Sequence, residues 1–235
     1  MNAASKSLCA SVKYISARAL ALPLILLASS FPAFAGAGKL EAIGPFTDAS
    51  ASEAVKKALE PKGWRVLLPD GSVLCEIWLR RNLATGKNEA QGATYTSLLD
   101  STFIGVITFP KPATDFRKQA IKPGTYTLRY SLHPIDGNHM GISPIRDFLL
   151  LAPIDADENP DAKYKFADLV ALSKKASGLN HPAPMSLVSP EGINNWPSLF
   201  EDEYGHLVFA AKVKTDSGTD LPIAFVVKGV AEQEG

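Results

Sequence analysis

Two histidines, a methionine and an aspartate lie close together in the segment LHPIDGNHMGISPIRDF, residues 132–148. Two imidazoles, a thioether and a carboxylate are ligand types that copper and zinc accept. The turn DGN in the middle of the segment could fold the second histidine back toward the first. One hypothesis is therefore a copper or zinc site, although the spacing matches no recognised ligand pattern. The candidate metal ligands are His133, Asp136, His139 and Met140.

A second hypothesis for the same region is a polar face that binds an anionic or sugar-like ligand. Arginine and histidine supply the N–H donors that such ligands accept, and the cationic Arg129 would disfavour a divalent metal ion nearby. The simpler alternative is that the histidines are surface groups and that Arg146-Asp147 is an ordinary ion pair at a strand end. The candidate ligand-binding residues are Arg129, His133, His139, Arg146 and Trp196.

Trp196 belongs to this candidate set because it lies in the loop sequence Asn194-Asn195-Trp196-Pro197. A tryptophan in a loop can stack on a sugar ring or anchor a partner protein. It can also fold down over the core, and this alternative stays open. Trp64 and Trp78 lie within predicted strands, so we interpret them as structural residues.

The acidic segment DADENPD, residues 155–161, resembles the start of a calcium loop because its oxygen-bearing side chains alternate. The pattern then fails, since Pro160 stands where glycine is needed and Phe166 where glutamate is needed. We interpret the segment as a solvated loop in which Asp161 caps the following helix, with an irregular calcium site as the alternative.

The first 35 residues have the features of a secretory signal peptide. Lys6, Lys13 and Arg18 precede an apolar run that is too short to span a bilayer comfortably, and small residues lead up to Gly36. We therefore expect residues 36–235 to form a single mature domain, secreted or periplasmic, with no membrane attachment after cleavage.

The composition of this expected mature chain bears on its partners. Removing residues 1–35 takes away three of the 24 basic residues and none of the 24 acidic ones, which leaves a net charge of about −3. That balance gives no electrostatic footprint for nucleic acid. Cys75 becomes the one remaining cysteine, and its position in the alternating segment SVLCEIWLR predicts an inert thiol inside an apolar core.

The segments around these residues predict a mostly β fold with about eight strands. Strands recur with turn signals between them and do not alternate regularly with helices, which favours an antiparallel β-sandwich or jelly-roll-like fold. Pro69-Asp70-Gly71 predicts a hairpin turn between the first two strands. The expected strands are WRVLL, SVLCEIWLR, STFIGVITF, TYTLRYSL, RDFLLLAPI, PMSLV, HLVFAAKV and PIAFVVKGV.

Two helices are expected in addition. ASEAVKKAL, residues 51–59, has an apolar stripe at helical spacing, with Ser50 or Ser52 available as its cap. YKFADLVALSKKASG, residues 164–178, predicts one helix inserted in the β series, ending at Gly178. In TYTLRYSL, alternation places Tyr126, Leu128 and Tyr130 on an apolar face and Arg129 among the polar residues opposite.

The run Pro-Gly-Thr-Tyr-Thr-Leu, residues 123–128, resembles a feature of exported bacterial β-sandwich modules of the immunoglobulin-like and transthyretin-like kinds. That resemblance implies a fold class and a role in binding, adhesion or assembly rather than catalysis. The sequence thus predicts an exported ligand-binding or accessory module, whose partner is a small molecule, a glycan or another exported protein. The alternatives are a metal-binding protein or metal-dependent enzyme using residues 133–140, and a carbohydrate-binding module.

Overall fold

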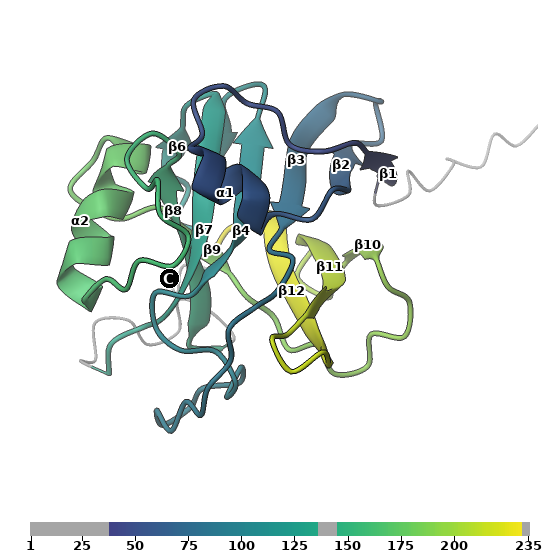
Figure 1. Cartoon of the computed structure of the whole chain (residues 1–235). Helices are drawn as coiled ribbons and strands as arrows, with labels where there is room; N and C mark the ends of the chain where they lie inside the picture. Colours follow the sequence, from purple (N-terminus) through teal and green to yellow (C-terminus); the bar gives the residue numbers. More distant parts are fainter. Residues whose placement is uncertain (1–37, 136–144, 232–235) are drawn as a thin grey trace, which may run out of the picture. The chain divides into compact units, whose positions relative to one another are not determined.

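The computed structural model describes residues 38–135 and 145–231, and these form a mostly β fold (Figure 1). They contain twelve strands, whose pairings within the sheets are all antiparallel, and two helices. All of them belong to the unit of the chain that runs from Ala35 to Gly235. The prediction of a mostly β, antiparallel fold with two helices is confirmed.

The largest sheet has seven strands in the order β1-β2-β3-β4-β7-β8-β9. Its strands are β1 (Lys39–Ile43), β2 (Gly63–Leu67), β3 (Val73–Leu79), β4 (Phe103–Phe109), β7 (Gly124–Leu132), β8 (Asp147–Pro153) and β9 (Pro184–Ser186). A second sheet contains β10 (Ser198–Glu201), β11 (Leu207–Lys214) and β12 (Asp220–Lys228). A two-stranded sheet pairs β5 (Ala113–Thr114) with β6 (Ala120–Ile121). The helices are α1 (Glu53–Ala58) and α2 (Phe166–Ser177).

Each of the eight segments expected to be strands contains one, and local chemistry explains several of them. The hairpin of β2 and β3 turns at Gly71, whose φ of 79° suits glycine, while Asp70 accepts a hydrogen bond from the backbone N–H of Ser72 at 2.9 Å. The four further strands, β1, β5, β6 and β10, have two to five residues each. Strands this short give too few residues for an alternating pattern to stand out.

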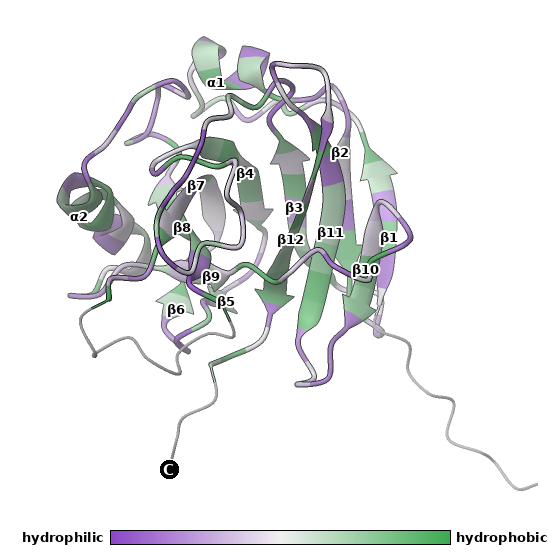
Figure 2. Cartoon of the chain, turned by 90° about the horizontal axis from the view of Figure 1, so that it is seen from below, coloured by the Kyte–Doolittle hydropathy of each residue, from purple (hydrophilic) through white to green (hydrophobic). Residues whose placement is uncertain are grey.

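Apolar side chains from both the seven-stranded and the three-stranded sheet contribute to the main core. Tyr126, Leu128 and Tyr130 of β7 are 6%, 0% and 0% exposed, as their alternation predicted. Phe209 of β11 and Phe225 of β12 belong to the same cluster, with ring centroids 5.5 Å apart. Figure 2 shows the apolar character of β11 and β12. The two sheets therefore contribute to one common set of buried side chains. Removing this apolar surface from water is the dominant favourable contribution to folding.

The opposite face of the seven-stranded sheet is covered by the two helices and the chain around them. Val55 of α1 packs with Trp78 and Val106, and Leu169 of α2 packs with Phe148. Ser52 caps α1 by accepting a hydrogen bond from the backbone N–H of Val55 at 3.1 Å, as expected for that position. The seven-stranded sheet is therefore covered on both faces in the regions where α1 and α2 pack against it.

The start of α2 corrects one expectation. The helix begins after Lys165, which makes no side-chain capping bond, so Asp161 is not its cap. Asp161 instead accepts a hydrogen bond from Arg80, with Nη2 and Oδ1 2.5 Å apart. The predicted end is confirmed, because Gly178 adopts the left-handed conformation with φ of 66°.

Arg129 lies on the polar side of β7, but that side is not open to solvent. Arg129 and Asp157 are both 0% exposed, and the guanidinium binds the carboxylate through two bonds of 2.7 Å. Its other donors reach the backbone carbonyls of Ser101, Ala162 and Asn159 at 2.7–3.0 Å. All five guanidinium N–H groups therefore have partners within the chain.

Removing one partner of this pair is expected to destabilise the protein strongly. Asp157→Asn should lower the free energy of unfolding by about 3–5 kcal/mol, because it leaves the guanidinium buried without a counter-charge. Urea denaturation followed by far-ultraviolet circular dichroism would measure the change. Asp155→Asn is the matched control, since Asp155 is exposed, and it should change stability by less than about 0.5 kcal/mol. Equal stabilities of the two variants would contradict this account.

A second expectation concerns Cys75, which is 0% exposed in β3. Burial raises the pKa of its thiol far above the usual range, so the thiolate that reacts with alkylating agents is essentially absent at neutral and mildly alkaline pH. Iodoacetamide at pH 8 should leave Cys75 unmodified in the folded protein and modify it in urea, as mapped by mass spectrometry of its peptide. Rapid modification under native conditions would show that this position is accessible.

Candidate functional site

The segment around residues 133–140 is described only in part. Asp136, His139 and Met140 lie outside the described residues. The ring of His133 stacks on that of Phe148 in β8, with centroids 4.2 Å apart and planes 17° from parallel. Within residues 38–135 and 145–231, no group of three or more histidine, cysteine, aspartate or glutamate side chains is placed to hold a metal ion.

Arg146 joins the ends of two segments rather than pairing with the residue next to it. Its guanidinium donates hydrogen bonds to the backbone carbonyls of His133 and Gln91, with a distance of 2.9 Å from Nε to the carbonyl of His133. The carboxylate of Asp147 accepts bonds from the backbone N–H groups of Thr94 and Tyr95 at 2.8 and 2.9 Å. Both side chains therefore fasten the chain around residues 91–95 to β8.

The structure brings Arg146 next to His133, through the backbone carbonyl of His133, but it does not gather Arg129 and Trp196 at the same place. All N–H donors of the Arg129 guanidinium bind Asp157 or backbone carbonyls beneath the chain that covers β7. The Arg146 guanidinium binds the backbone carbonyls of His133 and Gln91. Trp196 lies elsewhere, beside the three-stranded sheet. The side chains of residues 155–161 do not support a calcium site, because the carboxylates of Asp157 and Asp161 form ion pairs with Arg129 and Arg80.

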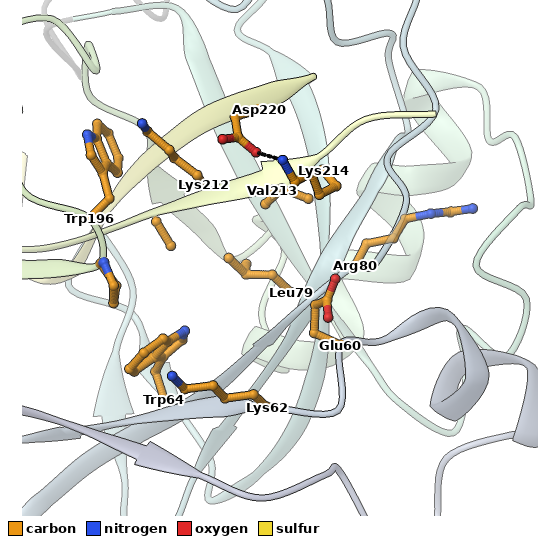
Figure 3. Close-up of a pocket in the computed structure, with 12 residues that line it drawn as sticks. Glu60, Lys62, Trp64, Leu79, Arg80, Trp196, Lys212, Val213, Lys214 and Asp220 are labelled. Carbon is orange, nitrogen blue, oxygen red and sulfur yellow. Dashed lines mark ion pairs between the residues drawn. The ribbon is translucent and has the colours of Figure 1, made fainter. Parts of the chain in front are cut away.

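Trp196 borders a pocket of about 240 Å³ that was not apparent from the sequence (Figure 3). One wall comes from β2, β3 and the residues before β2, and the other from β11, the start of β12 and the turn at Trp196-Pro197. Aromatic, aliphatic and charged side chains share the lining. The lining residues are Glu60, Lys62, Trp64, Leu79, Arg80, Trp196, Pro197, Ala211, Lys212, Val213, Lys214 and Asp220.

The two tryptophans of this pocket are held by different means. Trp64 is on β2, which pairs with β1 on one side and β3 on the other, and its side chain packs against the main core. Trp196 is partly buried over a smaller cluster that includes Val208 and Ala224, and its Nε1–H donates to the carbonyl of Ile193 at 3.1 Å. Both alternatives weighed for Trp196 are therefore compatible with its position, since it packs on the protein and lines a pocket.

A lysine lies over each indole ring. Lys62 places its Nζ 4.3 Å from the centroid of Trp64, and Lys212 places its Nζ 5.8 Å from the centroid of Trp196. A cation–π contact at an exposed site is worth about 0.5–1 kcal/mol. A hydrogen bond to a charged group is worth about 1.5–3 kcal/mol. Either ammonium group can therefore leave its ring when a better acceptor enters the pocket.

The remaining charges of the pocket are largely balanced. Lys214 pairs with Asp220 at 2.6 Å, and this hydrogen bond is the main cause that lowers the pKa of Asp220 below its ordinary value. Arg80 donates to the carbonyls of Asn82 and Pro160 at 2.8 and 3.0 Å and to Asp161. Figure 3 shows its guanidinium pointing away from the tryptophans.

Part of this site carried a signal in the sequence. Lys212 and Lys214 alternate with Ala211 and Val213 in the strand AAKVK, which predicts two lysines on one exposed face. Nothing local, however, indicates that this face lies opposite Trp64. The sequence interpretation of Trp64 as purely structural was incomplete for that reason.

Comparison with known proteins adds no relative to this description. No protein-family model, no curated protein and no solved structure matches the chain. A search of the described residues for a helix long and apolar enough to cross a membrane also found none. The geometry of the pocket therefore carries the functional argument.

Proposed function

We propose that this protein is an exported ligand-binding module of the β-sandwich type, and that it binds a carbohydrate in the pocket between Trp64 and Trp196. The observation that carries the proposal is the presence of two partly exposed indole rings on different walls of one pocket (Figure 3). Tryptophan offers a flat apolar surface together with a polar N–H, which suits a ring that is apolar on its faces and polar at its rim.

The fold supports this proposal in two ways. A seven-stranded and a three-stranded antiparallel sheet contribute to one core, which is the arrangement expected of a sandwich. Residues 1–35 have the composition of a signal peptide, which supports export and a secreted or periplasmic location.

The size of the pocket favours a small cyclic ligand or one end of a chain. Pockets for drug-sized molecules are about 300–1,000 Å³, and this one is about 240 Å³. Its lining includes the apolar residues Leu79, Pro197 and Val213 together with the two tryptophans. A sugar ring could bury its faces there and keep its hydroxyl groups near charged and polar partners.

Binding is proposed in preference to glycoside cleavage because Asp220, one of the two acidic residues of the pocket, is not suited to act as a protonated acid. Glycoside cleavage by paired carboxyl groups needs one acid that remains protonated, which requires a raised pKa. Lys214 shifts the pKa of Asp220 downward, so this group stays ionised at neutral pH and serves to balance charge.

Tryptophan fluorescence would test the proposed function. Titration with a panel of neutral and acidic oligosaccharides should change the emission for at least one ligand, because two of the three tryptophans line the pocket. Calorimetry with that ligand should show affinities about tenfold weaker for Trp64→Ala and for Trp196→Ala, since an aromatic contact contributes about 0.5–1.5 kcal/mol beyond buried area.

Phe166→Ala is the matched control for these variants. Phe166 is an exposed aromatic residue on α2 that does not line the pocket, so its removal should leave the affinity unchanged. The absence of any response across the panel would contradict the proposed function. So would tryptophan variants that bind as tightly as the control.

A further inference from the structure

We infer that the ligand of this pocket is an acidic saccharide, whose sugar ring carries a carboxylate or sulfate group held by Lys62 and Lys212. The inference rests on the proposed function and specifies the chemistry of its ligand. It is carried by the distribution of charge around the two tryptophans.

The pocket lining contains an excess of positive charge. Four of its lining residues are cationic and two are acidic. Lys214 and Asp220, one of each kind, form an ion pair. Arg80 is engaged outside the pocket by Asp161 and two backbone carbonyls. Among the described residues, no ion pair is formed by Lys62 or Lys212.

The positions of these two lysines suit a bound anion. Lys62 precedes β2 and Lys212 lies on β11, so they reach the pocket from different walls. Figure 3 shows each lysine beside its own tryptophan, with the pocket between the two pairs. A ring between the indoles would therefore have an ammonium group within reach on either side, and an acidic substituent could attract one or both.

The contact of each lysine with an indole ring connects binding of an anion to stacking of a sugar on that ring. The two ammonium groups lie over the indole rings, 4.3 and 5.8 Å from the ring centroids. When an ammonium group turns toward an anion, it gives up its contact with the indole ring. A neutral sugar must displace the same ammonium group without offering it a charged acceptor, and we therefore expect it to bind more weakly.

Matched pairs of ligands would test the inference with the full chain, produced with its own N-terminal segment. The probes are oligogalacturonate against its methyl ester, and a cello-oligosaccharide against its C6-carboxylated and C6-sulfated forms. Calorimetry at low salt should show that an acidic form binds about tenfold more tightly than its neutral partner, the size expected of one added charged hydrogen bond. The preference should shrink as sodium chloride is raised, because the lysines are exposed. The carboxylated and sulfated arms identify which acid is preferred.

Substitutions then locate the effect. Lys62→Gln and Lys212→Gln should each weaken binding of the preferred acidic ligand about fivefold to tenfold. Neither substitution should weaken binding of the neutral partner, because a neutral sugar then has no ammonium group to displace from the ring. Lys175→Gln on α2 is the matched control, because Lys175 is also exposed and lies outside the pocket lining.

The failures of the two proposals are distinguishable. Equal binding of neutral and acidic forms, with both sensitive to Trp64→Ala, would overturn the inference about charge and retain the binding function. An acidic preference that Lys175→Gln reduces as much as Lys62→Gln does would reflect general attraction and would also overturn the inference. No binding of any probe would overturn the inference together with the proposed function.

Discussion

The buried pair of Arg129 and Asp157 is the interaction on which the covered side of the large sheet depends. A guanidinium taken out of water loses strong hydration, and it is tolerated only where a counter-charge and further acceptors replace that hydration. Here Asp157 supplies the charge, and three backbone carbonyls supply the remaining acceptors. Two of those carbonyls, from Asn159 and Ala162, belong to the chain that leads into α2. The pair therefore fixes this chain onto β7 as well as neutralising itself.

The same stretch of chain connects the sheet to α1 and to the candidate pocket. The hydroxyl of Ser52, which caps α1, donates to the carbonyl of Glu158 at 2.5 Å. Arg80 follows β3 and bonds to the carbonyl of Pro160 and the carboxylate of Asp161. Because Arg80 is thereby drawn toward residues 160 and 161, its charge is directed away from the two tryptophans. The packing on one side of the sheet thus influences which cations remain available in the pocket.

The sequence predicted those features whose causes are local. Pro69-Asp70-Gly71 predicted a turn, and the alternation through Tyr126, Leu128 and Tyr130 predicted an inward face; the structure contains both. Ser50 or Ser52 was predicted to cap the first helix, and the structure shows that Ser52 does so. Arg129 was predicted to bind a ligand on a polar face, because alternation separates polar from apolar residues but does not reveal whether another layer covers the polar side. Its partner lies 28 residues away. The pocket was missed for a related reason, since Trp64 and Lys212 belong to different sheets and no local pattern relates them.

The pocket combines fixed aromatic walls with adaptable charges, and this division suits recognition of a small polar ring. Trp64 is held by strand pairing on both sides, and Trp196 is fixed by its bond to the carbonyl of Ile193 and by the cluster beneath it. Walls that are already ordered lose little conformational entropy when a ligand enters. Lys62 and Lys212 lie at the surface on long side chains, so they can adjust to the position of an acidic group. The tryptophans would then set the plane of the ring, and the lysines would select its charge.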